Sequence, residues 1–501
     1  MKKASYVIGL DIGTTSAKSV VFTKSGEVIS EAEAGYPVTH PHPGWAEQDP
    51  LEIEQAAFRA VRESLEKKRI PAEAVHSVGL SAAMHALICV DEKTEPLSPV
   101  IIWADGRSRS QAESWKASPE GRAMYLATGT PIHPMSPLLK LIWMKDTGYE
   151  PYRKAERFLS VKEFLTARWF GIHAVDYSIA SATGMFDIRR KTWHAPALAA
   201  CGISEEQLSP PVSPLYQFSP LHADAAEKLG LSRDTPFTAG GSDGPLANLG
   251  IGAVTPGSTA VTIGTSGAIR QMSAAPQTDE KQEVFCYAFS EDRWILGGPT
   301  NNGGNVLQWL QGIYGNHSDV SGILKEAEKA PAGSDGLLFL PHLNGERAPH
   351  WDAAARGAYV GLAADHERHH MLRAGLEGTL FSIYHVGEAL SRLTGENAVL
   401  YASGGFARSP FWVQLLADIF EETVHLPESH QSSAWGAAWT SLTASGETDG
   451  LDAVAGSIPM GTPVHPDAAS SAVYRQLFHT YKHLYDALKP AFHELHAFRN
   501  Q

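Results

Sequence analysis

Oxygen-rich side chains gather in one short turn near the start of the sequence. Residues 6–22 read YVIGLDIGTTSAKSVVF, so an apolar run ends at Asp11 and a second begins after Thr14 and Thr15. Backbone N–H groups in a tight turn form a concave anion site, and a carboxylate can hold Mg²⁺, which bridges to phosphates. We therefore expect Asp11 to hold a metal and the two threonines to hold phosphate. Lys18 is a further candidate for a phosphate oxygen, and a plain hairpin with solvated hydroxyls is the alternative.

A second turn of the same kind lies just past the middle of the chain. Residues 263–268 read IGTSGA, whereas residues 12–17 read IGTTSA. The second turn lacks the carboxylate, so phosphate would be held by Gly264, Thr265 and the backbone. The repeat suggests two related halves, each with a hydroxyl-rich hairpin turn. The sequence has no GxxxxGK[ST] motif, so this is not a P-loop.

Two other motifs point to different chemistry. The segment GGSDG matches the GxSxG nucleophile elbow, which would make Ser242 the nucleophile of a serine hydrolase. The segment HERHH matches HExxH at His366, Glu367 and His370, a zinc-binding pattern when both histidines share a helical face. Neither motif explains the two phosphate-like turns, so we keep the hydrolase as the alternative of a different class and expect the histidines to lie in a solvated first helical turn.

The surrounding elements are typical of an α/β protein. Apolar strand-like runs at residues 6–11 and 18–22 come before a helical pattern that begins at Asp49, with Pro50 in its first position and Glu52 three residues after the cap. The apolar stripe of this helix is formed by Ile53, Ala57, Val61 and Leu65. Strands followed by a helix and more strands predict an α/β domain.

Composition limits the class of protein. The chain has 501 residues, a length that suggests two to four domains, and 43% of the residues are apolar. A formal charge of −14 argues against general nucleic-acid binding. Cys89, Cys201 and Cys286 are far apart, which favours a reducing, cytoplasmic location over a disulfide framework. No apolar run is long enough to cross a membrane, and the N-terminal run is too short for a signal peptide.

The order of several motifs resembles the FGGY family of carbohydrate kinases. After DIGTTSAK come GWAEQDP, SAAMH and IIWADGR, then MSPLLKLIWMKD (135–146), GAYVGLAADHERHHMLRAGLE (357–377) and SGGFARSPFWVQLLADIF (403–420). Thr147 and Gly375 stand where the family signatures usually have other residues. The resemblance implies two actin-like ATPase (ribonuclease H-like) domains with a catalytic cleft between them. We place these domains at residues 1–248 and 249–501. The resemblance also implies the use of ATP and Mg²⁺ and the phosphorylation of a sugar or polyol hydroxyl.

The same resemblance implies roles for individual residues. Asp243 stands where the family has its catalytic base, and a carboxylate on a tight turn can accept the proton of an attacking hydroxyl. Ser409 stands where many relatives have asparagine. The positions matching the family's nucleotide side are Gly304, Gln308, Gly404, Gly405 and Ser409.

The substrate side is predicted from two further segments. Met84 and His85 follow a strand, while WADGR offers Trp103 as an apolar wall, Asp105 as a hydroxyl acceptor and Arg107 as a carboxylate partner. The amino-acid sequences of these segments look most like those of the family branch that phosphorylates D-gluconate to 6-phosphogluconate. Xylulose and other pentulose or polyol kinases are the alternative, and the missing Arg-Glu pair disfavours glycerol. The expected partners are ATP and a sugar or sugar acid, with no nucleic acid and no membrane; a homodimer is left open.

Overall fold

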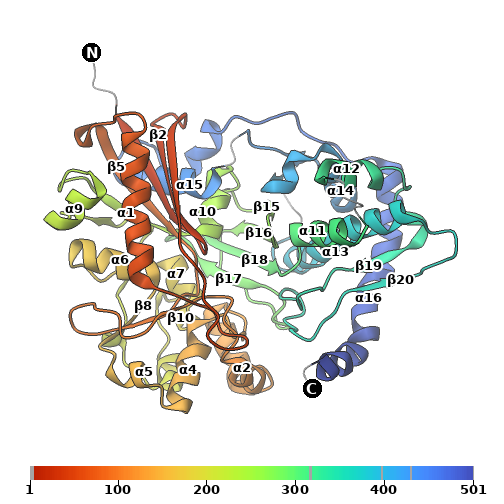
Figure 1. Cartoon of the computed structure of the whole chain (residues 1–501), viewed down its shortest axis with the longest axis horizontal. Coiled ribbons are helices and arrows are strands. Elements are labelled where there is room, and N and C mark those ends of the chain that lie inside the picture. The colour runs from red at the N-terminus through yellow and green to blue at the C-terminus, as the bar shows by residue number, and fades with distance from the viewer. Residues whose placement is uncertain (1–4, 315–318, 396–398, 429–430, 500–501) are drawn as a thin grey trace. The chain divides into compact units, whose positions relative to one another are not determined.

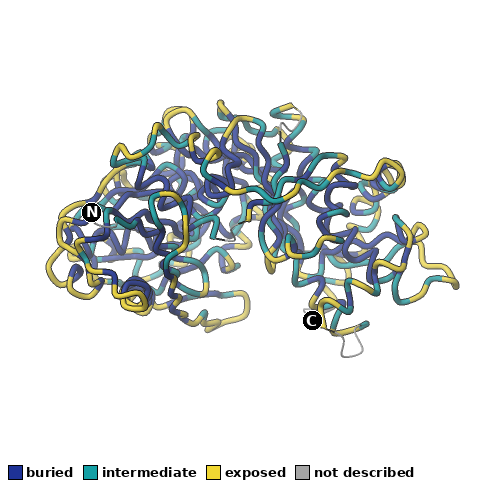
Figure 2. Tube along the Cα trace, turned by 90° about the horizontal axis from the view of Figure 1, so that it is seen from above, coloured by how far each residue is buried: buried dark blue, intermediate teal, exposed yellow. Residues whose placement is uncertain are grey.

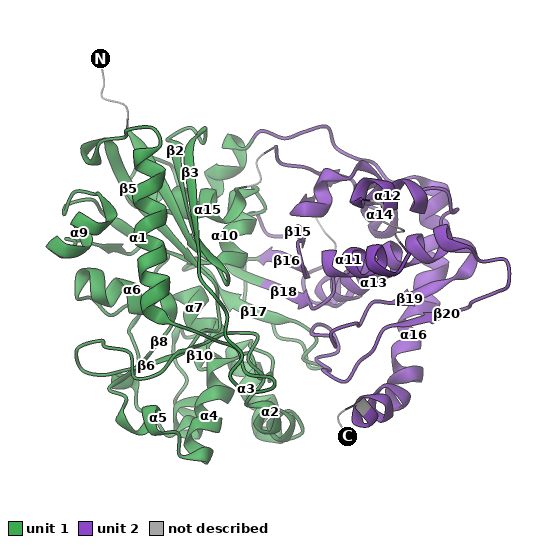
Figure 3. Cartoon of the chain, viewed as in Figure 1, with its two compact units in different colours: residues 1–254, 273–295, 431–458 green, residues 255–272, 296–430, 459–501 purple. Residues whose placement is uncertain are grey.

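The structure is a computed structural model, and it describes residues 5–314, 319–395, 399–428 and 431–499. The chain forms two compact units (Figure 3). The first contains residues 1–254, 273–295 and 431–458, and the second contains residues 255–272, 296–430 and 459–501. The units thus differ from a single division at residue 248, because two later segments join the first unit.

The first unit is built on a mixed sheet with the strand order β13-β14-β5-β1-β2-β3. Strands β2 and β5 of this sheet are labelled in Figure 1. Strand β1 pairs antiparallel with β2 and parallel with β5, and β5 in turn pairs parallel with β14. Consecutive residues of the central strands β1 and β5 are buried, so both faces of these strands are covered. Figure 2 shows the buried parts of the chain in dark blue. The strands are β1 (Tyr6–Ile12), β2 (Ser16–Thr23), β3 (Val28–Gly35), β5 (Val75–Ala82), β13 (Gln217–Phe218) and β14 (Phe237–Ser242).

Helix α1 (Pro50–Glu66) packs against β2 and β3. The predicted start is confirmed, since the Asp49 side chain accepts a hydrogen bond from the N–H of Leu51 at 2.8 Å and Pro50 is the first helical residue. The predicted stripe is also confirmed, because all four of its residues, Ile53, Ala57, Val61 and Leu65, are buried. Capping and periodicity together were therefore sufficient to place this helix.

Helix α15 (Ser432–Ala444) packs against β1 and β5, and α10 (Asp243–Gly250) packs against α15. The approach is close enough to require glycine in both strands. A Cβ on Gly9 would lie 1.9 Å from the carbonyl oxygen of Ala434, and one on Gly79 would lie 1.7 Å from that of Ala437. This packing explains why a segment so late in the chain belongs to the first unit.

The first unit contains further helices and strands. They are β4 (Glu47–Gln48), β6 (Ile88–Val90), β7 (Val100–Ile101), α2 (Arg109–Lys116), α3 (Pro119–Thr128), α4 (Pro137–Thr147), α5 (Glu150–Lys154), β8 (Arg157–Leu159), α6 (Val161–Phe170), β9 (Val175–Asp176), α7 (Tyr177–Ala182), β10 (Phe186–Asp187), β11 (Thr192–Trp193), α8 (Ala195–Cys201), β12 (Pro211–Val212), α9 (Ala223–Leu229) and β17 (Phe285–Ala288).

The second unit repeats the pairing pattern of the first. Strand β15 (Ser258–Ile263) pairs antiparallel with β16 (Gly267–Ser273) and parallel with β21 (Val399–Ser403). This is the arrangement of β1 with β2 and β5, so the predicted relation between the two halves is visible in their topology. The other strands are β18 (Trp294–Thr300), β19 (Leu338–Leu340), β20 (Ala358–Val360) and β22 (Val424–His425).

Long helices complete the second unit. They are α11 (Gly304–Tyr314), α12 (Val320–Ala327), α13 (Arg368–Thr394), α14 (Pro410–Phe420) and α16 (Ala468–Arg499). Helix α13 packs against β19, α11, α12 and α14. Within the described ranges, no helix is both long and apolar enough to cross a membrane.

Candidate active site

Three parallel strands of the first unit end at the same level. Ile12 of β1 lies opposite Ala82 of β5, and Ala82 lies opposite Ser242 of β14. Each strand is followed at once by a predicted site segment: the turn after Asp11, the pair Met84–His85, and Asp243. Because the carboxyl ends of parallel strands share one edge of a sheet, the fold brings these segments together, as it does in other α/β ligand sites.

The Asp11 carboxylate is held at both oxygens. Its Oδ1 accepts a hydrogen bond from Ser81 Oγ at 2.6 Å, and its Oδ2 accepts one from Ser433 Oγ at 2.6 Å. A carboxylate oxygen has two lone pairs, so each can still bind a metal ion. Hard oxygen ligands of this kind fit Mg²⁺. Sequence reasoning missed both serines: Ser81 is a strand residue opposite Asp11, and Ser433 is 422 positions away, where no local pattern could connect it.

The turn after Asp11 is closed by a hydrogen bond from the Gly13 N–H to the Ser16 carbonyl at 2.9 Å. Thr14 Oγ1 accepts from Trp103 Nε1 at 2.9 Å, while Thr15 is exposed. Tyr36 donates to the Gly13 carbonyl at 2.5 Å, and burial, together with the charge of Asp11, raises the pKa of this phenol. Trp103, which we predicted for the substrate side, therefore also contacts the turn at which we predicted phosphate binding.

Asp243 is the first residue of α10 and is half-buried. Its Oδ1 accepts a hydrogen bond from the N–H of Gly244 at 2.8 Å. A carboxylate at the start of a helix is stabilised in its charged form by the backbone N–H groups there. A charged carboxylate is the state that a proton acceptor requires.

His85 has a left-handed backbone, with φ of 68°, and its side chain is buried. Its Nδ1 lies 2.7 Å from the carbonyl oxygen of Ala182; since a carbonyl only accepts, Nδ1 carries the proton. Lys140, fully buried, donates to the His85 carbonyl at 2.6 Å, and burial lowers the pKa of this amine to about 7. The Met84–His85 turn is thus held from two sides.

A small cavity of about 10 Å³ joins the first turn to the substrate side. Three predicted site residues, Thr14, Met84 and Trp103, line it. The other lining residues are Ile12, Gly13, Gln48, Ile53, Ala83, Ala86, Ile102 and Val161. This volume is about that of one water molecule, so the cavity shows which side chains meet here rather than where a sugar fits.

Asp105 and Arg107 form a buried ion pair instead of two separate ligand groups. Arg107 donates from Nε to Asp105 Oδ1 and from Nη2 to Oδ2, both at 2.8 Å, and also reaches Glu47 at 2.5 Å. Its guanidinium lies 3.7 Å from the ring centroid of Trp45, and neither side chain of the pair is exposed. A direct substrate contact of Asp105 or Arg107 would therefore require this pair to open.

Lys18 has a partner of opposite charge. Its Nζ lies 3.4 Å from a carboxylate oxygen of Glu31, and 30% of its side chain is exposed. Both residues lie on neighbouring strands, β2 and β3. A solvated position on the strand, paired with Glu31, thus explains Lys18 at least as well as the predicted phosphate contact.

The second unit contains a large, mostly apolar pocket of about 620 Å³. Four of the predicted nucleotide residues, Gly264, Gly304, Gly405 and Ser409, line it. Its apolar walls come from α11, α12 and α14, and the lining includes Leu307, Val320, Leu324, Phe406, Pro410, Phe411 and Trp412. A pocket of this size and apolar character fits a flat nucleobase.

The remaining nucleotide-side residues lie around this pocket rather than in its wall. Thr265 is exposed in the second hairpin turn, and Gln308 is exposed on α11. Gly404 has φ of 95°, and a Cβ there would lie 2.5 Å from the Ile263 carbonyl oxygen, so packing alone requires this glycine. Ser409, which lines the pocket, also caps α14, because its Oγ accepts from the N–H of Trp412 at 3.2 Å.

The two alternative motifs lie in different surroundings. Ser242 is fully buried at the end of β14, and no described residue hydrogen-bonds to its Oγ. His366 and Glu367 come before the first residue of α13, whereas His370 lies inside it. The two histidines of HExxH thus do not share the face of one helix. Among the described residues, no group of three metal-ligating side chains was found.

Comparison with known proteins finds relatives over most of the chain. The N-terminal domain model of the FGGY family of carbohydrate kinases matches residues 6–250, and the C-terminal domain model matches residues 259–445. A gluconokinase of Bacillus subtilis (strain 168) is 41% identical over 488 residues, which cover 95% of each chain.

Solved structures are also similar to nearly the whole chain. A gluconate kinase from Lactobacillus acidophilus has a TM-score of 0.95 and 33% identity, covering 98% of this chain and 99% of the other. A ligand-bound xylulose kinase from the same organism has the same TM-score and identity and covers 98% and 100%. The overall fold therefore does not distinguish these two substrates.

Proposed function

Because the chain belongs to the FGGY family of carbohydrate kinases, we propose that it uses ATP to phosphorylate a sugar acid, converting D-gluconate to 6-phosphogluconate. The family assignment and the fold of two actin-like (ribonuclease H-like) domains, both predicted from the sequence, are confirmed. Support for gluconate comes from the 41% identity to the gluconokinase of Bacillus subtilis, whereas the gluconate kinase and xylulose kinase structures are equally similar to this chain, at 33% identity. Phosphorylation of xylulose is the second candidate.

The observation that carries the proposal is the common level at which β1, β5 and β14 end. It places Asp11, the Met84–His85 turn and Asp243 at one edge of a sheet. ATP with Mg²⁺ would supply the phosphoryl group. Asp243 would accept the proton of the attacking hydroxyl, and Asp11, oriented by its two serine donors, would hold the metal.

His85 is the better of two candidates for recognising the substrate carboxylate. The charge of Arg107 is already balanced by Asp105 and Glu47. His85 instead is oriented by its Nδ1 bond to the Ala182 carbonyl, and its Nε2 would donate to a carboxylate in the protonated imidazolium, in which both ring nitrogens carry a hydrogen. Replacing His85 with alanine should therefore raise KM for gluconate more than KM for ATP.

Nucleotide binding is assigned to the second unit. Gly264, Thr265 and Gly304 would approach the phosphates, and the 620 Å³ pocket would take the base. Gln308, Gly404, Gly405 and Ser409 would complete this site. Thr14 and Thr15 would bind phosphate through their hydroxyls. A cytoplasmic location and a homodimer stay predictions.

The deciding experiment measures ADP release with gluconate, xylulose, ribulose and glycerol as acceptors. We expect kcat/KM to be highest with gluconate. A clear preference for xylulose would replace the substrate while leaving the kinase class in place. The hydrolase alternative is tested in parallel with a fluorophosphonate probe, which should not label the buried Ser242.

A further inference from the structure

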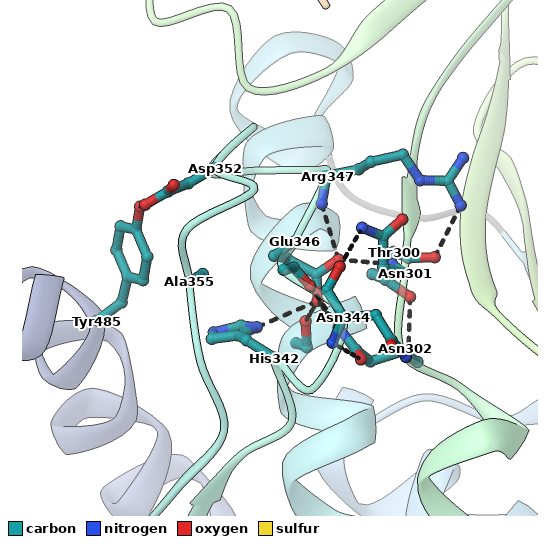
Figure 4. Close-up of polar contacts among 12 residues, drawn as sticks. Thr300, Asn301, Asn302, His342, Asn344, Glu346, Arg347, Asp352, Ala355 and Tyr485 are labelled. Carbon is teal, nitrogen blue, oxygen red and sulfur yellow. Dashed lines mark hydrogen bonds and ion pairs between the residues drawn. The ribbon is translucent and has the colours of Figure 1, made fainter. Parts of the chain in front are cut away.

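The second unit, to which we assign nucleotide binding, also contains a completely buried carboxylate. Glu346 follows β19, and its side chain has no exposed surface. Figure 4 shows its polar contacts with the surrounding residues. Both of its oxygens accept hydrogen bonds. The donors to Oε1 are the backbone N–H of Asn301 at 2.6 Å and of Arg347 at 2.9 Å; those at Oε2 are Asn302 Nδ2 at 3.0 Å, His342 Nδ1 at 3.2 Å and Ser382 Oγ at 3.4 Å.

Two of these donors belong to the turn that joins β18 to α11. Further bonds connect the same turn to the segment around Glu346: Asn302 Nδ2 donates to the Gly345 carbonyl at 2.8 Å, and Asn301 Nδ2 donates to the Asn344 carbonyl at 3.0 Å. The Asn344 N–H returns a bond to Asn302 Oδ1 at 3.3 Å. The position of residues 301–302 is therefore set by the segment 344–346.

The next residues of this turn touch the second hairpin turn directly. The N–H of Gly304 donates to the Gly264 carbonyl at 2.7 Å, and the N–H of Asn305 donates to the Thr265 carbonyl at 3.0 Å. A Cβ on Gly303 would lie 2.5 Å from the carbonyl carbon of Ser266, and one on Gly304 would lie 2.6 Å from the Gly264 oxygen. The backbones of the two turns are therefore in direct contact, with no room for a side-chain atom between them. A shift of residues 301–304 would displace residues 264–266 as well.

A carboxylate suits this position better than an amide. Each oxygen of Glu346 accepts from at least one N–H donor. A glutamine would have to place its NH₂ group against one of these donors and leave that donor unpaired. Removing a charged acceptor from a buried donor costs more than an ordinary hydrogen bond contributes.

From this chain of contacts we propose that Glu346 is a positioning residue for nucleotide binding. It holds the turn 301–304, and through it the turn 264–266, at the spacing that the phosphates of the nucleotide require. Glu346 acts through these turns and does not itself touch the nucleotide. The inference rests on the proposed use of ATP.

The test compares Glu346→Gln with the control Asp352→Asn in the full-length protein. Asp352 lies in the same segment and exchanges backbone hydrogen bonds with Glu346 at 2.9 Å. Its carboxylate, however, accepts from Tyr485 at 2.7 Å and His493 at 3.0 Å, on the side facing α16 (Figure 4). Both substitutions thus neutralise a carboxylate in the same segment. Of the two carboxylates, however, only that of Glu346 accepts hydrogen bonds from the turn 301–302.

Calorimetric titration with ADP and steady-state kinetics give the readouts. For Glu346→Gln we expect Kd for ADP and KM for ATP to rise by about tenfold or more, with KM for the sugar within about twofold of wild type. Asp352→Asn should leave all three within the same twofold range. Glu346→Asp, which keeps the charge on a shorter side chain, should recover part of the ADP affinity.

Each result decides one question. Wild-type protein that fails to bind ADP would overturn the proposed use of ATP. Wild-type binding with equal binding by Glu346→Gln would overturn only the role of Glu346, as would an equal rise of both KM values. If neither Glu346 variant folds while Asp352→Asn does, Glu346 is a stability residue and the positioning role is rejected.

Discussion

Replacing Lys140 with methionine should remove a pH dependence from the stability of the protein. Lys140 lies on α4 with a fully buried side chain, and its Nζ donates to the carbonyls of His85 at 2.6 Å and Ile101 at 3.2 Å. Burial lowers the pKa of the amine to about 7. A neutral amine keeps two N–H groups, which match the two carbonyl acceptors, so the surroundings favour the uncharged form.

The size and sign of the effect follow from the two pKa values. An unfolded lysine has a pKa near 10.4, so between pH 7 and pH 9 the unfolded chain holds a proton that the native Lys140 has released. Stability therefore rises with pH in this range. Since the native amine is half-protonated at pH 7, the gain by pH 9 is about 2 kcal/mol. Well below pH 7 both states are protonated and the effect is constant.

Guanidinium unfolding of wild type, Lys140→Met and Lys145→Met at pH 7 and pH 9 measures this gain. Lys145 is a matched control on the same helix, because its side chain is exposed. The methionine at 140 leaves two carbonyls without a donor, which lowers stability by an amount that does not depend on pH. The prediction is that the wild-type advantage over Lys140→Met grows by about 2 kcal/mol from pH 7 to pH 9. Equal pH dependence of these two proteins would refute the reasoning.

Three further outcomes are expected from the site and the packing around it. Asp243→Asn should lower kcat by about a hundredfold or more while ADP binding is unchanged, as loss of a general base does; the exposed Asp234→Asn is the control in the same kinetic assay. Ser433→Ala should raise the Mg²⁺ concentration for half-maximal activity by about tenfold, because Asp11 loses one orienting donor. Gly79→Ala should lower the free energy of unfolding by about 3 kcal/mol or more, measured by denaturation, since its Cβ would lie 1.7 Å from a carbonyl oxygen of α15.

Local signals in the sequence predicted the local structure well. The start of α1 at Asp49–Pro50 and its buried stripe needed only capping and helical periodicity. The turns after β1 and β15 were recognised for the same reason, because the residues that define them are adjacent in the chain.

Partners that are distant in the sequence could not be predicted in this way. Ser433 can donate its hydrogen bond to Asp11 only because α15 packs on β1. That packing requires glycines in the strands, where the backbones approach too closely for a side chain. The ion pair of Asp105 and Arg107 was read as two separate ligands because the carboxylate of Glu47 and the ring of Trp45, which enclose it, lie about sixty residues earlier. Spacing along the chain shows which groups are near each other but not which of them are already paired.

The two halves carry different chemistry at one equivalent position. Asp11 lies opposite Ser81 across β1 and β5, and in the second unit Thr262 lies opposite Ser403 across β15 and β21, with their hydroxyls 2.9 Å apart. Each residue precedes the last residue of its strand and the hairpin turn that follows. A carboxylate can hold Mg²⁺, whereas a second carboxylate near a polyphosphate would repel it. The neutral threonine is therefore compatible with the phosphate binding that we propose for the second turn, and the carboxylate of Asp11 with the metal binding that we propose for the first.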